Sequence, residues 1–263
     1  MTPILNVKQL TMDFGGLRAL SRVDMDIQMG EIVALIGPNG AGKTTFFNCI
    51  TGIYSPSKGD VIITPSGKGS ERINGLKPNQ VTEKGMARTF QNIRLFPTMT
   101  VLENVMIGRH CRTKAWIVGA LLRTPAMRAE EKKVLQDSYV LLEKVGLADQ
   151  SDELAKNLSY GAQRRLEIAR AMATDPFLLL LDEPAAGMNP QETLELVDLI
   201  NRIRDKEGIS ILLIEHDMKL VMSLSDRIFV VDYGKKIAQG TPDQIKNNPV
   251  VIKAYLGEDI DDA

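Results

Sequence analysis

A glycine-rich segment, LIGPNGAGKTT at positions 35–45, constrains the fold of this chain more than any other feature. A continuous apolar stretch, EIVALIG, leads into it, and a helical pattern follows from about Lys43 to Thr51. The segment matches G-x-x-x-x-G-K-[ST] at every fixed position. Glycines let backbone N–H groups curve around an anion, and the helix presents its positive N-terminus there. The segment therefore predicts a phosphate-binding loop between a strand of a doubly covered sheet and a helix.

Two side chains of this loop have distinct expected roles toward a bound triphosphate. Lys43 would reach the β- and γ-phosphates, and the hydroxyl of Thr44 would bind Mg²⁺. A glycine-rich turn before an ordinary capped helix is the alternative interpretation. The expected nucleotide-binding residues of the segment are Gly37, Pro38, Asn39, Gly40, Ala41, Gly42, Lys43, Thr44 and Thr45.

Two adjacent acids, Asp182 and Glu183, follow the apolar run FLLLL. A carboxylate at the carboxyl end of a buried strand beside a phosphate loop suits Mg²⁺, held through water. The next carboxylate can polarise an attacking water. A solvated corner at the end of a strand is the alternative, and the neighbouring phosphate loop makes the functional interpretation the stronger one.

One histidine, His216, follows a second buried strand, ILLIE. An imidazole in that position can donate a hydrogen bond to the γ-phosphate and orient water. A structural histidine at a strand end is the alternative interpretation. The chain has only two histidines, so a histidine-rich metal site is excluded.

The segment LSYGAQRRLEIARAMA contains a second potential anion site. Ser159 and Gly161 lie where a helix begins, so a hydroxyl and helix N–H groups converge there. Plain helix capping is the alternative. One nucleotide does not need two phosphate sites in one chain, whereas two chains facing each other would each bind the other's γ-phosphate.

Hydrophobic periodicity predicts an α/β core with an inserted helical lobe. Residues 23–29 alternate as an antiparallel strand, with Val23, Met25, Ile27 and Met29 on one side. A hairpin is expected to turn at Tyr233–Gly234. The predicted parts are an α/β core with a β lobe over 1–90 and 158–240, a helical lobe over 91–157, C-terminal helices over 241–257, and an acidic tail over 258–263.

Composition and hydropathy argue against nucleic acid and against insertion in a bilayer. The net charge is −1, so there is no basic surplus for nucleic acid. The two cysteines have no metal-ligand spacing. The N-terminus lacks the pattern of a signal peptide, and the apolar run AWIVGALL is far shorter than the roughly 20 residues of a transmembrane helix. We expect this run to pack as a helix and the chain to be cytoplasmic, peripheral to a membrane through a partner.

Taken in this order, the motifs resemble the ATP-binding subunits of ABC transporters. They comprise the phosphate loop, Gln91 in RTFQN, LSYGAQ at 158–163, LLLLDEP at 178–184 and His216. The resemblance covers nearly the whole chain. It implies a single ABC ATPase domain over 1–257, with a P-loop NTPase core of mainly parallel sheet flanked by helices, an antiparallel β lobe and an α-helical lobe. It also implies hydrolysis of ATP with Mg²⁺.

The resemblance implies a role for each matching side chain. Glu183 would act as general base or polarise the attacking water, and His216 would hold the γ-phosphate and that water. Gln91 would contact Mg²⁺ or water and sense the γ-phosphate, and the segment 92–103 would touch the membrane subunits. The implied metal ligands are Thr44, Gln91 and Asp182.

Further segments resemble one branch of that family, the ATPases of bacterial branched-chain amino acid importers. They include ARTFQNIRLFPTMTVLENVMIGRH, QRRLEIARAM, LDEPAAGMNP and NNPVVIKAYLGE. The lipopolysaccharide-export ATPase resembles these segments less closely, and the insertion around 109–133 also favours the importer. An importer of another amino acid or amide is a further alternative. The implied partners are a second ATPase subunit (a paralogue, or the same chain as a homodimer), two transmembrane permease subunits and, indirectly, an extracytoplasmic substrate-binding protein. The implied location is the cytoplasmic face of the inner membrane.

The chain departs from the general family pattern at several positions. The signature is LSYGA, with Tyr160 and Ala162 substituted, and Asn189 stands where aspartate is more frequent. Ser159 and Gly161, which would contact phosphate, are retained, whereas Asn189 weakens any inference about communication across a dimer. The aromatic residue that stacks on adenine is often tyrosine, and here the best match is Phe14, for which an ordinary core phenylalanine is the alternative.

Two other classes of P-loop protein fit less well. A GTPase would carry an N-K-x-D guanine-binding motif, which is absent from the sequence. A small-molecule kinase would not need Glu183 beside Asp182 or the second anion site. A DNA-repair or ribosome-associated relative would usually carry a long coiled-coil insertion or two cassettes in one chain.

Overall fold

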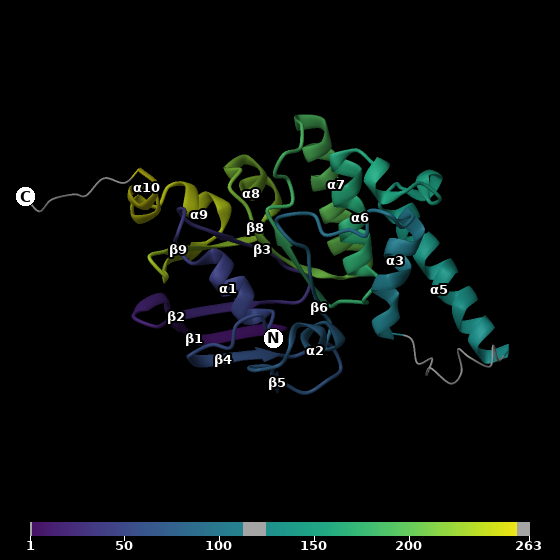
Figure 1. The fold of residues 1–263 in the computed structure, drawn as a ribbon. Helices are drawn as coiled ribbons and strands as arrows, with labels where there is room; N and C mark the ends of the chain where they lie inside the picture. Colours follow the sequence, from purple (N-terminus) through teal and green to yellow (C-terminus); the bar gives the residue numbers. More distant parts are fainter. Residues whose placement is uncertain (1, 113–124, 257–263) are drawn as a thin grey trace, which may run out of the picture.

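The computed structural model describes residues 2–112 and 125–256, which form two sheets with helices around them (Figure 1). The smaller sheet is antiparallel, with the strand order β2-β1-β4-β5. Its strands pair in antiparallel fashion and come from the first third of the chain. They are β1 (Leu5–Phe14), β2 (Leu17–Ile27), β4 (Lys58–Ile63) and β5 (Glu71–Arg72).

The larger sheet has six strands in the order β10-β9-β3-β8-β7-β6. All neighbouring strands are parallel except β9 and β10, which form a hairpin. Three central strands, β3, β7 and β8, are buried at every position, as expected of a sheet covered on both faces. The strands are β3 (Ile32–Ile36), β6 (Met86–Arg88), β7 (Leu178–Asp182), β8 (Ser210–Ile214), β9 (Arg227–Asp232) and β10 (Lys235–Gly240).

Nine α-helices lie in the described ranges, apart from three short 3₁₀ turns. The helical lobe contains α3 and α5, which pack on each other beside α6 (Figure 1). The α-helices are α1 (Lys43–Ile50), α2 (Pro78–Glu83), α3 (Val101–Arg109), α5 (Pro125–Lys144), α6 (Tyr160–Met172), α7 (Pro190–Glu207), α8 (Met218–Leu224), α9 (Pro242–Lys246) and α10 (Pro249–Leu256).

Alternation along β3 explains why the larger sheet separates two hydrophobic cores. Val33 and Leu35 pack in one core with α1 and the antiparallel sheet. Ile32, Ala34 and Ile36 pack in the other with α6, α7 and α8. Successive side chains of a strand point to opposite faces, so a fully apolar strand supplies both cores at once. The predicted α/β fold is confirmed by this arrangement.

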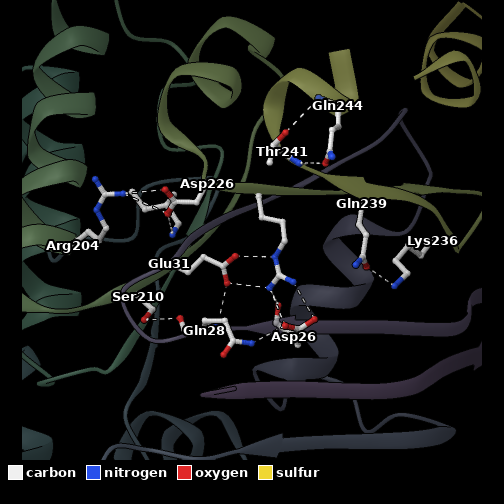
Figure 2. A network of polar contacts seen from close by, with 12 residues as sticks. Asp26, Gln28, Glu31, Arg204, Ser210, Asp226, Lys236, Gln239, Thr241 and Gln244 are labelled. Atoms are coloured by element: carbon white, nitrogen blue, oxygen red, sulfur yellow. Dashed lines mark hydrogen bonds and ion pairs between the residues drawn. The ribbon is translucent and has the colours of Figure 1, made fainter. Parts of the chain in front are cut away.

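An arginine on β9, Arg227, joins the two sheets. Its guanidinium donates to both carboxylate oxygens of Glu31 at 2.8 and 3.0 Å, and to the Asp26 carboxylate at 2.9 and 3.3 Å. It also donates to the Asp26 carbonyl at 2.7 Å. Asp26 lies on β2 and Glu31 just before β3, so one side chain contacts both sheets; the surrounding polar network is shown in Figure 2.

Local elements match the expectations except at a few positions. The hairpin turns at Tyr233–Gly234, where both residues have positive φ. Met29, expected on the buried side of its strand, is 60% exposed because β2 ends at Ile27. The apolar run at 115–122 and the acidic tail at 258–263 lie outside the described residues. In the described ranges, no helix combines the length and the apolar character that a bilayer crossing requires.

Candidate functional site

The predicted phosphate loop connects β3 to α1, and close packing requires glycine at two of its positions. A Cβ on Gly37 would lie 2.0 Å from the carbonyl oxygen of Val231, and a Cβ on Gly42 would lie 2.8 Å from that of Ala19. Gly42 has φ +101 and precedes the helix. The first helical bond runs from the Phe46 N–H to the Gly42 carbonyl at 2.9 Å. The N–H groups of the first turn therefore have no helical acceptor and face the loop.

Lys43 curls back over the loop. Its ammonium donates to the carbonyl oxygens of Gly37 at 2.7 Å and Pro38 at 2.9 Å. Burial lowers the pKa of this amine, while the negative charges of Glu183 and Asp182 act in the opposite direction. A triphosphate would offer this buried cation a counter-charge that the two carbonyl dipoles provide only in part.

Glu183 lies between Gln91 and His216, and the three predicted residues are joined through its carboxylate. Gln91 Nε2 donates to one carboxylate oxygen at 2.8 Å, and His216 Nε2 lies 2.8 Å from the other. The Glu183 backbone has φ +48, an uncommon conformation for a residue with a side chain and one that concentrates at functional sites. The group brings together side chains from β6–α3, β7 and β8, at the carboxyl ends of parallel strands.

Asp182, one residue earlier, points to a different partner. Its carboxylate accepts a hydrogen bond from Arg88 at 2.7 Å, and the Asp182 side chain is 4% exposed. Arg88 is the first residue of the RTFQN segment, but sequence patterns did not connect it to Asp182, because 94 positions separate the two residues.

A cavity of about 670 Å³ joins the loop to this group. Phe14 lines it, is 40% exposed and meets the ring of Tyr54 edge-on at 5.2 Å, so it is not an ordinary core phenylalanine. Arg18 and the 87% exposed Tyr233 also line the cavity, and the sequence reasoning missed both. The predicted residues in the lining are Phe14, Asn39, Gly40, Ala41, Gly42, Lys43, Thr44, Thr45, Gln91, Glu183 and His216.

Ser159 and Gly161 lie outside this cavity, at the start of α6. The Ser159 hydroxyl accepts a hydrogen bond from the Ala162 N–H at 3.3 Å, so within one chain it acts as a helix cap. A Cβ on Gly161 would lie 2.6 Å from Glu192 Oε1. A single chain therefore does not bring these two residues to its own phosphate loop. Gly37, Pro38 and Asp182 are likewise not among the residues lining the described cavity.

A buried arginine on α6, also missed, joins the signature helix to the segment of Gln91. Arg164 pairs with Glu167 at 2.9 Å, and the two side chains are 0% and 1% exposed. Arg164 donates to the carbonyls of Phe90 at 2.7 Å and Gln91 at 2.9 Å. Glu167 accepts from the Phe90 and Arg94 N–H groups at 3.3 Å. The i,i+3 spacing of an arginine and a glutamate was the available signal, and it was weak because α6 also carries Arg165 and Arg170.

The oxygen donors near the loop fit Mg²⁺ bound together with a nucleotide. Across residues 2–112 and 125–256, no three histidine, cysteine, aspartate or glutamate side chains gather to hold a metal. Mg²⁺ rarely uses an all-protein cage and usually takes one or two carboxylates plus substrate phosphates. The predicted ligands Thr44, Gln91 and Asp182 offer oxygen donors of that kind.

Comparison with known proteins identifies the family. The profile of the ABC transporter family matches residues 20–186, and that of the branched-chain amino acid ATP-binding cassette transporters matches residues 235–261. The chain is 50% identical over 256 residues to the high-affinity branched-chain amino acid transport ATP-binding protein LivG of Escherichia coli (strain K12), over 97% of this chain and 98% of that one. It is 32% identical, over the same shares, to the lipopolysaccharide export system ATP-binding protein LptB of Haemophilus influenzae.

A solved structure gives the same result. The ADP conformation of MJ1267, an ATP-binding cassette of an ABC transporter, matches with a TM-score of 0.83 and 30% identity, over 98% of this chain and 100% of that one. Fold and site together thus define an ATP-binding cassette with ATPase activity. The chain belongs to the branched-chain amino acid transport ATP-binding proteins of the ABC transporter family. The resemblance seen in the sequence is confirmed.

The aromatic wall of the cavity yields a first prediction. Replacing Phe14 by alanine should weaken ATP binding by about 1–3 kcal/mol, because a stacked ring is lost from the base. Phe14→Tyr should retain affinity. Titration calorimetry with ATP measures both, and Met29→Ala, an exposed apolar residue outside the cavity, is the control. Equal affinity of the Phe14→Ala variant and the unchanged chain would show that Phe14 does not contact the base.

Proposed function

We propose that this chain couples ATP binding and hydrolysis to the uptake of branched-chain amino acids through separate permease subunits. The observation that carries the proposal is the 50% identity to LivG over nearly the full length of both chains. The match of residues 235–261 to the profile of branched-chain amino acid cassettes supports the same cargo. The cargo itself is assigned by similarity, since no residue of the cavity would touch a transported molecule.

We assign the chemical roles from the geometry of the site. Lys43 and the first turn of α1 bind the phosphates. Glu183, between Gln91 and His216, orients and polarises the attacking water, because two hydrogen bonds fix both of its oxygens. His216 would turn to the γ-phosphate when nucleotide is bound. Thr44 and Asp182 would hold Mg²⁺, which supplies charge stabilisation for phosphoryl transfer.

We propose that Ser159 and Gly161 act on a nucleotide bound to a facing ATPase subunit. Their separation from the chain's own cavity supports this, because a hydroxyl and helix N–H groups at an exposed helix start can receive a phosphate from outside. Closing such a dimer from 1:99 to 99:1 requires about 5.5 kcal/mol of differential binding, which two bound triphosphates can supply.

The proposed assembly contains this chain, a paralogous ATPase rather than a second copy, two permease subunits and an extracytoplasmic substrate-binding protein. The chain would lie on the cytoplasmic face of the inner membrane. Within it, we propose the division into a core with β lobe (1–90 and 158–240), a helical lobe (91–157) and C-terminal helices (241–257). The segment 92–103 would contact the permeases.

Purification of the tagged chain from gently extracted membranes tests this assembly. We expect a second ATPase and two polytopic permeases to co-purify, and leucine uptake to depend on the chain. A homodimer recovered with a lipopolysaccharide-export membrane pair would favour that alternative, which the 32% identity to LptB leaves weaker. Recovery with ribosomes or DNA and no membrane partner would contradict transport while leaving the ATPase chemistry in place.

A further inference from the structure

A buried arginine at the end of β6, Arg88, contacts the Asp182 carboxylate on one side only. Arg88 Nη2 donates to Oδ2 at 2.7 Å, and the two side chains are 10% and 4% exposed. Among the described residues, no donor forms a hydrogen bond to the other oxygen, Oδ1. One oxygen of the predicted metal carboxylate is therefore fixed by protein, and one is left for a ligand.

Arg88 is itself held from several directions. Its Nη1 donates to Asn48 Oδ1 at 2.7 Å and to Thr51 Oγ1 at 3.3 Å, both at the far end of the helix that follows the phosphate loop. Its guanidinium lies 5.5 Å from the ring centroids of Phe47 and Phe90. Its Nε is buried without a partner in the described parts of the chain. The guanidinium thus keeps its position although one of its donors is left unpaired.

We propose that Arg88 is a positioning residue for the magnesium site: by holding Oδ2 of Asp182 it keeps the second oxygen oriented toward the metal. The inference rests on the proposed metal role of Asp182. Hydrogen-bond partners behind a metal ligand orient it, and their removal typically lowers metal affinity or activity about 10–100-fold. Arg88 also provides the counter-charge that a buried carboxylate needs before the metal binds.

The test compares ATP affinity of the full chain in EDTA and in Mg²⁺. For Arg88→Met we expect the ATP affinity in EDTA to stay within roughly twofold of that of the unchanged chain. The increase in ATP affinity that Mg²⁺ causes should fall roughly 10–100-fold. Mn²⁺ binding to the ADP complex, followed by electron paramagnetic resonance, should weaken in parallel. Arg94→Met is the matched control: its guanidinium also lies over Phe90, at 4.5 Å, but no contact with Asp182 is described.

Other outcomes separate the possible failures. Equal losses in EDTA and in Mg²⁺, or an unchanged gain from Mg²⁺, would overturn the role of Arg88. An unchanged chain that binds ATP with no gain from Mg²⁺ would instead contradict the proposed metal role of Asp182. If Arg88→Met does not fold, Arg88→Lys carries the test. Its single ammonium retains the charge but cannot bridge Asn48 and Asp182 together. We therefore expect the gain in ATP affinity from Mg²⁺ to fall by roughly 10-fold, the lower end of the range.

Discussion

Replacing Glu183 by glutamine should reduce ATP turnover about 10²–10⁴-fold while ATP binding persists. The amide keeps the shape of the side chain and removes the charge that would polarise water. It also places a second amide opposite Gln91, whose Nε2 now donates to a carboxylate oxygen at 2.8 Å. Phosphate release under saturating ATP measures the turnover, and equilibrium binding of ATP measures the affinity.

Glu195→Gln is a suitable control for this variant. Glu195 lies on α7 with a side chain that is 48% exposed, so the same chemical change there should leave turnover unaffected. A Glu183→Gln variant with normal turnover would show that the base is another group. A variant that loses ATP binding as well would show that Glu183 is part of the binding site and would leave its catalytic role unsupported.

Replacing Arg164 by methionine should lower the free energy of unfolding by about 3–5 kcal/mol, because it leaves Glu167 buried without its counter-charge. Burial already raises the pKa of the Glu167 carboxyl, and Arg164 is the main influence acting in the opposite direction. The carbonyls of Phe90 and Gln91 would lose their donor as well. Urea unfolding followed by circular dichroism measures the change.

Two further variants test whether the unpaired Glu167 charge causes this loss of stability. Arg165→Met changes the next residue, whose side chain is 26% exposed and lies 3.6 Å from Glu195, and should cost about 0–1 kcal/mol. The double variant Arg164→Met with Glu167→Leu should recover much of the lost stability, since an apolar pair needs no counter-charge. A stable single variant, or a double variant no better than the single one, would contradict the explanation.

Local patterns were enough to predict the elements that carry the site. A phosphate loop depends on consecutive residues, so the turn after β3 and the start of α1 at Lys43 were readable from the chain. Apolar runs predict buried strands, and such runs end just before Asp182, Glu183 and His216. Because the carboxyl ends of neighbouring parallel strands share one edge of a sheet, their convergence also followed.

Contacts between distant residues could not be read in this way. Arg88 meets Asp182, and Arg164 meets the segment of Gln91, through packing that no local pattern encodes. Periodicity also failed at the margins of elements. Met29 was expected on the apolar side of its strand and is 60% exposed, because β2 ends at Ile27.

Because Arg227 contacts both sheets, it affects how far the nucleotide site is preorganised for ATP. Phe14 ends β1 in one sheet, and the phosphate loop follows β3 in the other sheet. The Arg227 guanidinium joins the two sheets at the ends that lie away from Phe14 and the phosphate loop. The distance between Phe14 and the phosphate loop is therefore set during folding. A nucleotide meets a preorganised recess, and little of its binding free energy is consumed in ordering that half of the site. More of that free energy would then be available for the proposed closure onto a facing subunit.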